Sequence, residues 1–123
     1  MSDLCIVIRT APYGTLAAAE GVRHMIGAAG EGMSVCAVLV DDGVYLAKQG
    51  QDPGGTAWAG LSAVLDQALG PRTGSSPRAR LYVHRSSAET RGLDLSDLVA
   101  GVELVDDVQV AAALASATAL LVF

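Results

Sequence analysis

The sequence predicts an α/β fold, a three-layer sandwich in which helices cover both faces of a mainly parallel five-stranded sheet. Continuous apolar runs without polar alternation recur along the chain, and such runs are typical of strands that are covered on both faces. Segments with helical spacing of apolar residues lie between these runs. Strands that alternate with helices form parallel sheets through right-handed crossovers. A length of 123 residues fits one core, so we expect a single domain over residues 1–123.

The first strand and its helix are expected in the N-terminal third of the chain. Residues 4–9 form an apolar, β-branched run, and a turn at residues 11–15 follows it. Gly14 is expected to adopt a backbone conformation that a larger side chain would strain, and Thr15 to cap the helix. Gly30 is placed to end this helix. Its apolar face follows the i, i+3, i+4, i+7 pattern in Val22, Met25, Ile26 and Ala29.

The middle of the chain predicts a second strand and two helices. Residues 34–40 repeat the strand pattern, and Asp41, Asp42 and Gly43 then provide a turn and a cap for a short helix over 44–48. After a loop, a long helix is expected to begin at Thr56 and to stop before the Gly-Pro pair at 70–71. Its apolar face comprises Trp58, Leu61, Leu65 and Ala68. Residues 72–77 are expected to be the most mobile segment.

The last third predicts three strands separated by helices. Residues 81–84 form the third strand, and Ser86 and Glu89 then have the spacing of a capping box for a short helix that Gly92 ends. His84 is therefore expected where a strand meets a helix. A fourth strand over 102–105 precedes a helix capped by Asp106 and Gln109, and a strand over 119–123 closes the chain.

Composition limits the classes of function. A net charge of -5 disfavours direct nucleic-acid binding, which depends on clustered basic residues. No apolar run approaches the roughly 20 residues of a membrane span, and no signal peptide is recognisable, so we expect a cytoplasmic protein. Hydrophobic residues make up 51% of the chain, more than a small monomer easily buries. The surplus indicates subunit contacts.

No cofactor or metal site is expected. The turn at Gly14 lacks the phosphate-binding and dinucleotide-binding glycine patterns. Cys5 and Cys36 are the only cysteines, and they have no neighbours at metal-ligand spacing. We expect both to be buried free thiols.

The candidate site residues are those that follow strands, because ligands bind at the carboxyl edge of an open parallel sheet. Gly14 and Thr15 open a helix that could hold a small anion, although a tight turn with a capping Thr15 explains them better. Asp42 and Gly43 fit a binding loop or a structural turn. His84 could act as a proton donor or base beside Ser86 and Ser87, or could be a hydrogen-bonded structural residue. No Ser-His-Asp arrangement is recognisable in the sequence.

The order of these motifs resembles the DsrE/DsrF-like family of sulfur-relay subunits, most closely its DsrF-like or TusC-like branch. The resemblance spans nearly the whole chain and rests on residues 11–15 (APYGT), Glu20 and Gly21, residues 42–44 (DGV), residues 81–84 (LYVH), Ser86 and Ser87, and residues 91–93 (RGL). It implies a flavodoxin-like or YchN-like fold and assembly as a homo-trimer, a homo-hexamer or a hetero-oligomer with related subunits.

The resemblance also implies a function with one departure. In active members a cysteine at the end of the third strand carries a persulfide, and this position corresponds to His84. Imidazole cannot replace a thiolate as a persulfide carrier. We therefore expect a non-catalytic or accessory subunit. The alternatives are a small-ligand or anion-binding module, and an enzyme that uses His84 on a small substrate.

Overall fold

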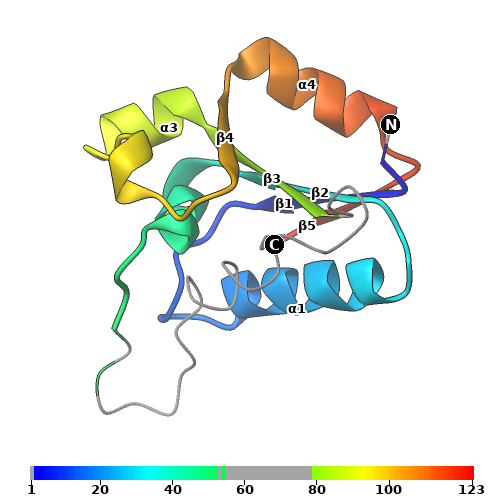
Figure 1. Ribbon diagram of the computed structural model, residues 1–123, viewed down its shortest axis with the longest axis horizontal. Helices are drawn as coiled ribbons and strands as arrows, with labels where there is room; N and C mark the ends of the chain where they lie inside the picture. The colour runs from blue at the N-terminus through cyan, green and yellow to red at the C-terminus, as the bar shows by residue number, and fades with distance from the viewer. Residues whose placement is uncertain (1, 53, 55–78) are drawn as a thin grey trace.

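The computed structural model describes residues 2–52, 54 and 79–123, and it confirms the α/β class (Figure 1). Every strand pair in the sheet is parallel, and the strands lie in the order β4-β3-β2-β1-β5. The strands are β1 (Leu4–Ile8), β2 (Val35–Leu39), β3 (Ala79–His84), β4 (Val102–Val105) and β5 (Ala119–Val122). The helix expected from Thr56 and the segment 72–77 lie outside the described residues.

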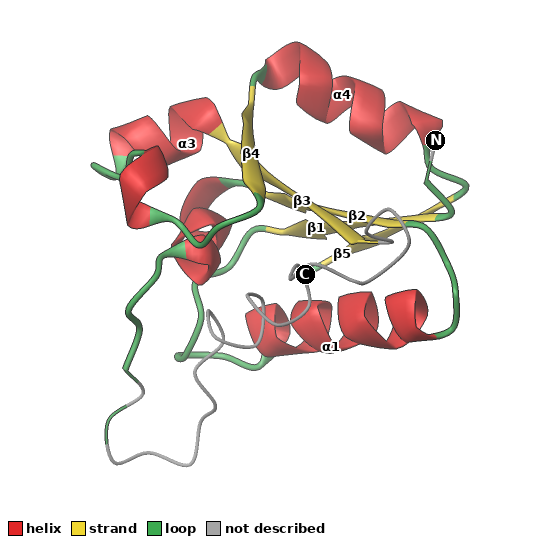
Figure 2. Ribbon diagram, viewed as in Figure 1, coloured by secondary structure: helices red, strands yellow, loops and turns green. Residues whose placement is uncertain are grey.

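Helices cover the two faces of the sheet, so the molecule has three layers (Figure 2). Helix α1 (Ala17–Gly30) lies on one face, and helices α3 (Arg85–Thr90) and α4 (Asp107–Ser116) lie on the other. Two 3-10 helices, η1 (Asp41–Ala47) and η2 (Leu95–Asp97), complete the connections.

The central strands form the core because they are covered on both faces. Every residue of β1 and β2 is buried. Ile6 and Ile8 point to the side of α1, where Val22 and Met25 join the same cluster. A smaller cluster lies on the opposite side of the sheet, beneath α4, and comprises Cys5, Cys36 and Val38.

The turn before α1 differs from the expectation. Leu16 is the residue that precedes the helix, and no side chain caps it, so Thr15 is not a cap. Gly14 has no positive φ, and a Cβ there would meet no atom within 4 Å. The left-handed residue of this turn is Tyr13, with φ of 71°. The expectation that Gly14 is conformationally constrained was therefore wrong.

The short helices also begin earlier than their polar residues suggested. Asp41 and Asp42 lie inside η1, after Val40, and therefore do not cap it. Ser86 lies inside α3, which His84 precedes, so Ser86 and Glu89 do not form a capping box. In both places the strand passes directly into the helix. Gly92 follows α3 in the left-handed conformation, as expected, with φ of 71°.

Candidate functional site at the carboxyl edge of the sheet

His84 is the last residue of β3 and the residue that precedes α3. In the sheet it lies opposite Val105, the last residue of β4. Because β4 runs parallel to β3, the start of α4 at Asp107 reaches the same edge as His84. The topology thus brings together two segments that are 23 residues apart in the chain.

The imidazole of His84 links two side chains. Its Nε2 lies 2.5 Å from Oδ1 of Asp107, and its Nδ1 lies 2.7 Å from Oγ of Ser87. The backbone N–H of Asp41 donates to the same Ser87 Oγ at 3.0 Å. A carboxylate can only accept, so Nε2 donates to Asp107, and the Ser87 hydroxyl can donate its proton to Nδ1.

Ser87, His84 and Asp107 therefore form a serine-histidine-aspartate row that was not recognisable in the sequence. Its geometry does not fit nucleophilic catalysis. Ser87 is only 7% exposed, and its hydroxyl is occupied by Asp41 and His84. A serine nucleophile needs an accessible oxygen next to the substrate. The row instead connects η1, α3 and α4 around the end of β3.

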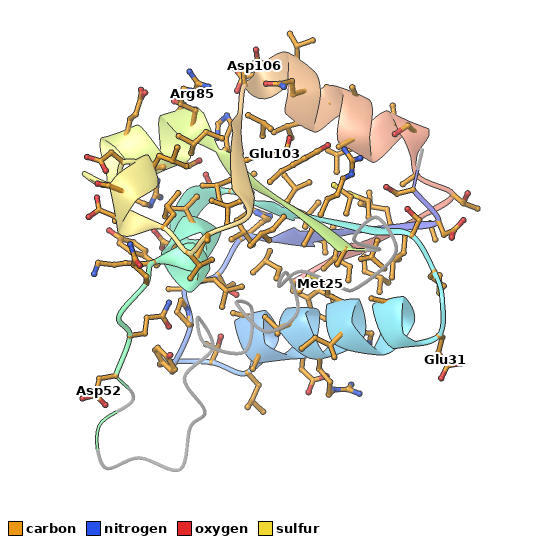
Figure 3. All side chains as sticks on the ribbon, in the orientation of Figure 1. Met25, Glu31, Asp52, Arg85, Glu103 and Asp106 are labelled. Carbon is orange, nitrogen blue, oxygen red and sulfur yellow. The ribbon has the colours of Figure 1, made fainter. Side chains whose placement is uncertain are left out.

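A shallow pocket of about 180 Å³ lies beside His84. Its lining mixes both charges and comes from the starts of α3 and α4: His84, Arg85, Ser86, Glu89, Asp106 and Asp107. Arg85 and Asp106 lie near each other above the same end of the sheet (Figure 3). The His84 side chain is 19% exposed and the Asp107 side chain 88%, so this part of the rim is open to a partner molecule.

Asp42 and Gly43 support the site and do not line this pocket. The guanidinium Nε of Arg91 donates to Asp42 at 3.0 Å, and its Nη1 donates to the carbonyl of Ser87 at 3.1 Å. Asp42 thereby connects η1 to α3. Gly43 is buried, and a Cβ on it would lie 2.0 Å from the carbonyl oxygen of Ile8. The glycine is needed because two backbone segments touch there.

Gly14 and Thr15 do not line the His84 pocket either. Both are exposed in the turn before α1. Their neighbour Tyr13 donates from its hydroxyl to Oε1 of Gln51 at 2.6 Å, and the amide of Gln51 donates to the carbonyls of Tyr45, Leu46 and Lys48. These hydrogen bonds tie the turn to the segment that follows η1.

The two cysteines lie away from the carboxyl edge. Cys5 and Cys36 are 0% and 3% exposed, which confirms the expected buried free thiols. They are register partners on adjacent strands, and both belong to the cluster beneath α4. Hydrogen bonding with the Cys36 thiol lowers the pKa of Cys5, although burial opposes the shift. The bond to Cys5, together with burial, raises the pKa of the Cys36 thiol.

Four residues of the pocket were not predicted as site residues from the sequence: Arg85, Glu89, Asp106 and Asp107. Asp107 could have been found by the carboxyl-edge rule, because it follows β4 directly after Asp106. What the sequence lacks is the order of the strands, which makes β4 the neighbour of β3.

The described part of the chain lacks two features, a metal-binding cluster and a membrane-spanning helix. Residues 2–52, 54 and 79–123 include no group of three or more His, Cys, Asp or Glu side chains placed to hold a metal ion. Within the same ranges, no helix has the length and apolar character that crossing a membrane requires.

Comparison with known proteins identifies relatives along the whole chain. The family model described as "DsrE/DsrF-like family" matches residues 2–123. "Intracellular sulfur oxidation protein DsrF" of Allochromatium vinosum is 39% identical over 92 residues, which cover 74% of this chain and 63% of that protein. The chain therefore spans less than two thirds of the length of that relative. "Protein TusC homolog" of Vibrio vulnificus is 29% identical over 126 residues and covers both chains completely.

The fold has a close match among solved structures. The crystal structure of the ychN protein from E. coli superposes with a TM-score of 0.84 over the whole of both chains, at 23% sequence identity. The expected YchN-like fold is confirmed. The relatives also confirm the resemblance to DsrF-like and TusC-like proteins.

Proposed function

Because the chain belongs to the DsrE/DsrF-like family, we propose that it is an accessory subunit of a sulfur-relay assembly and does not itself carry sulfur. A relative named for intracellular sulfur oxidation and a TusC homologue supply the context of sulfur transfer. By the family resemblance, His84 occupies the position of the sulfur-carrying cysteine. The expected partners are related subunits that have this thiol.

The observation that carries the proposal is the position of the chain's two cysteines. Persulfide transfer needs a thiolate that a donor can reach. Cys5 and Cys36 are buried near the amino ends of β1 and β2. Cys36 lies opposite Arg80, four positions before His84 on β3, so it is about 13 Å from the carboxyl edge at about 3.3 Å per residue. Neither sulfur is placed for transfer at the rim.

The contacts of His84 support a role in shaping a surface. Both ring nitrogens are bonded to side chains, one on α3 and one on α4. An imidazole whose nitrogens are both engaged must break one bond before it can exchange a proton with a substrate. We infer that His84 holds the ends of β3 and α4 in one arrangement, which a partner subunit then contacts.

The open pocket beside His84 favours a second candidate, a binding module for a small charged molecule. Arg85, Glu89 and Asp107 offer groups of both signs to a ligand there. Under this candidate, metabolites that carry both charges should raise the melting temperature of the wild type and not of Arg85→Ala. A third candidate, an enzyme that uses His84, requires turnover that is lost in His84→Gln.

The decisive experiment is sulfur loading of the purified protein. The wild type is incubated with a persulfide donor and analysed by intact mass under non-reducing conditions, and it should gain no sulfur atom. The His84→Cys variant should gain one, because a thiol at the end of β3 opens on the pocket beside the Ser87 hydroxyl.

The matched control is Thr90→Cys, which places an exposed thiol at the opposite end of α3. It measures how readily any surface cysteine takes up sulfur, and it should retain less than His84→Cys. Site-specific loading of the wild type on Cys5 or Cys36 would contradict the proposal, since it would make this chain a sulfur carrier.

A further inference from the structure

The Cys5 and Cys36 thiols form a chemically distinct pair that the carboxyl-edge site does not use. They lie directly opposite each other on β1 and β2, and both side chains belong to the cluster beneath α4. Two cysteines in register on neighbouring strands, 31 positions apart in the chain, are an arrangement that no local sequence spacing reveals.

The spacing of the two backbones is compatible with a covalent bond between the sulfurs. Adjacent strands lie about 4.7–4.9 Å apart, which is inside the range of about 4.4–6.8 Å between Cα atoms joined by a disulfide. The pair therefore needs little movement of β1 and β2 to become a disulfide.

The cover over this pair is thin. Val110, Ala113 and Leu114 of α4 pack against the cysteine cluster, and all three are only partly buried. No residue of α4 is buried, whereas α1 on the opposite face buries five. A helix with so little buried surface separates from the sheet at a low free-energy cost.

The start of α4 is held at the carboxyl edge. Asp106 and Gln109 form a capping box, and Asp107 is bonded to the Nε2 of His84. The bond between His84 and Asp107 thus ties the covering helix to β3. Losing it should let α4 leave the sheet more often.

We propose that Cys5 and Cys36 are a thiol-disulfide site, which a small hydroperoxide reaches when α4 lifts from the sheet. The Cys5 thiolate attacks one peroxide oxygen, the O–O bond breaks, and Cys5 becomes a sulfenic acid as the first water leaves. The Cys36 sulfur then attacks Cys5, the S–S bond forms and a second water leaves. Two thiols lose two electrons and two protons, and one hydrogen peroxide is reduced to two waters.

The two sulfurs differ in the direction of their pKa shifts. Hydrogen bonding with the Cys36 thiol favours the thiolate form of Cys5 and lowers its pKa, although burial opposes this shift. The same bond, with burial, raises the pKa of Cys36. Cys5 is therefore the first nucleophile and Cys36 the resolving thiol.

The test uses the reduced, full-length protein under native conditions. After treatment with hydrogen peroxide, intact mass should show the loss of two hydrogen atoms, and peptide mapping without reduction should give one Cys5–Cys36 linkage within the chain. Cys36→Ala should instead stop at the sulfenic acid, which a dimedone probe detects. The mapped linkage in the wild type is informative even if that variant folds poorly.

The role of α4 is tested with two variants that each remove one exposed carboxylate. Asp107→Ala removes the hydrogen bond to His84, and it should speed disulfide formation roughly twofold to fivefold, as expected for loss of one contact that restrains a local opening. Glu31→Ala, at the end of α1 on the opposite face of the sheet, should leave the rate unchanged.

Three outcomes would overturn the proposal. The first is that both thiols stay reduced in the folded protein and are oxidised only at the rate of global unfolding. Hydrogen exchange under the same conditions measures that unfolding rate. The second is a disulfide that links two chains. The third is an equal oxidation rate in the wild type and Asp107→Ala, which would exclude α4 as the barrier.

Discussion

Gly43 shows how closely backbone segments approach at the carboxyl edge of the sheet. Any side chain there would meet the main chain of β1, since a Cβ would lie 2.0 Å from the oxygen and 2.7 Å from the carbonyl carbon of Ile8. The N–H of Val40 also donates to this oxygen, so the carbonyl cannot turn away without losing a hydrogen bond. The residue that the sequence suggested for binding is thus required for packing.

We predict that Gly43→Ala lowers the free energy of unfolding by about 1–3 kcal/mol or more, because backbone must move to admit the methyl group. Chemical denaturation measures this value. The matched control is Gly14→Ala, where the added carbon meets nothing within 4 Å, and its effect should stay within about 0.5 kcal/mol. Equal stability of both variants would contradict the close approach of η1 to β1.

Ser87 contributes to the site through its hydrogen bonds. Its buried hydroxyl accepts from the N–H of Asp41 and contacts Nδ1 of His84. We predict that Ser87→Ala lowers the free energy of unfolding by about 1–3 kcal/mol, since it leaves the partly buried N–H of Asp41 without its acceptor. Thermal denaturation of Ser87→Ala and of the exposed control Ser86→Ala provides the measurement. A larger loss in Ser86→Ala would be incompatible with this hydrogen-bond arrangement.

At the scale of elements, the start of α4 is the best defined helix terminus. The Asp106 carboxylate accepts from the N–H of Gln109 at 2.8 Å, and the Gln109 side chain accepts from the N–H of Asp106 at 3.0 Å. We predict that Asp106→Ala costs about 0.5–2 kcal/mol of unfolding free energy. Because the two bonds form one unit, the double variant with Gln109→Ala should cost less than the sum of the single variants. Strict additivity in a double-mutant cycle would argue against a cooperative cap.

The second capping box, at η2, gives a prediction for pH. The side chain and backbone of Ser96 both donate to Asp94 and lower the pKa of this carboxyl below its ordinary value of 3.8. A lowered pKa stabilises the fold above 3.8, and this stabilisation is lost as pH falls through the folded-state value. An NMR titration of the carboxyl should place the Asp94 pKa below 3.8, and Ser96→Ala should raise it. An unchanged midpoint in that variant would remove Ser96 as the cause.

The elements that the sequence predicted well are those with local signals. The β1 and β2 strands follow from uninterrupted apolar runs, and the α4 cap follows from the spacing of Asp106 and Gln109. Helix starts at η1 and α3 were misplaced because a polar residue that could cap a helix can also lie inside its first turn. The η2 capping box between Asp94 and Asp97 was not anticipated.

The candidate site was predicted only in part for a different reason. The sequence pointed to His84 and Ser87, and the structure joins them at 2.7 Å. Their partner Asp107 comes from an element that is distant in the chain, and only the strand order places it there. The register of Cys5 with Cys36 likewise follows from the pairing of the strands, and no local sequence pattern predicts it.

At the scale of the whole molecule, large apolar side chains remain exposed along α4 and β5. Val108 is 76% exposed, and Leu120, Leu121 and Val122 of β5 are 37–57% exposed. Strand β5 lies at one end of the strand order, next to β1. Exposed apolar side chains on an edge strand are typical of protein contact surfaces.

We therefore predict that the purified protein is larger than its monomer mass of 12.5 kDa. Burial of the β5 side chains between subunits would remove them from water, and this favours closed oligomers. Light scattering coupled to gel filtration measures the mass at micromolar concentration. Leu120→Lys should reduce it, because a charge on the edge strand opposes contact with another subunit. Lys48→Ala, an exposed change next to η1, serves as the control and should leave the mass unaltered. A monomer mass for the wild type would contradict self-assembly. The remaining form of assembly would be a hetero-oligomer, which should then form when this protein is mixed with related subunits.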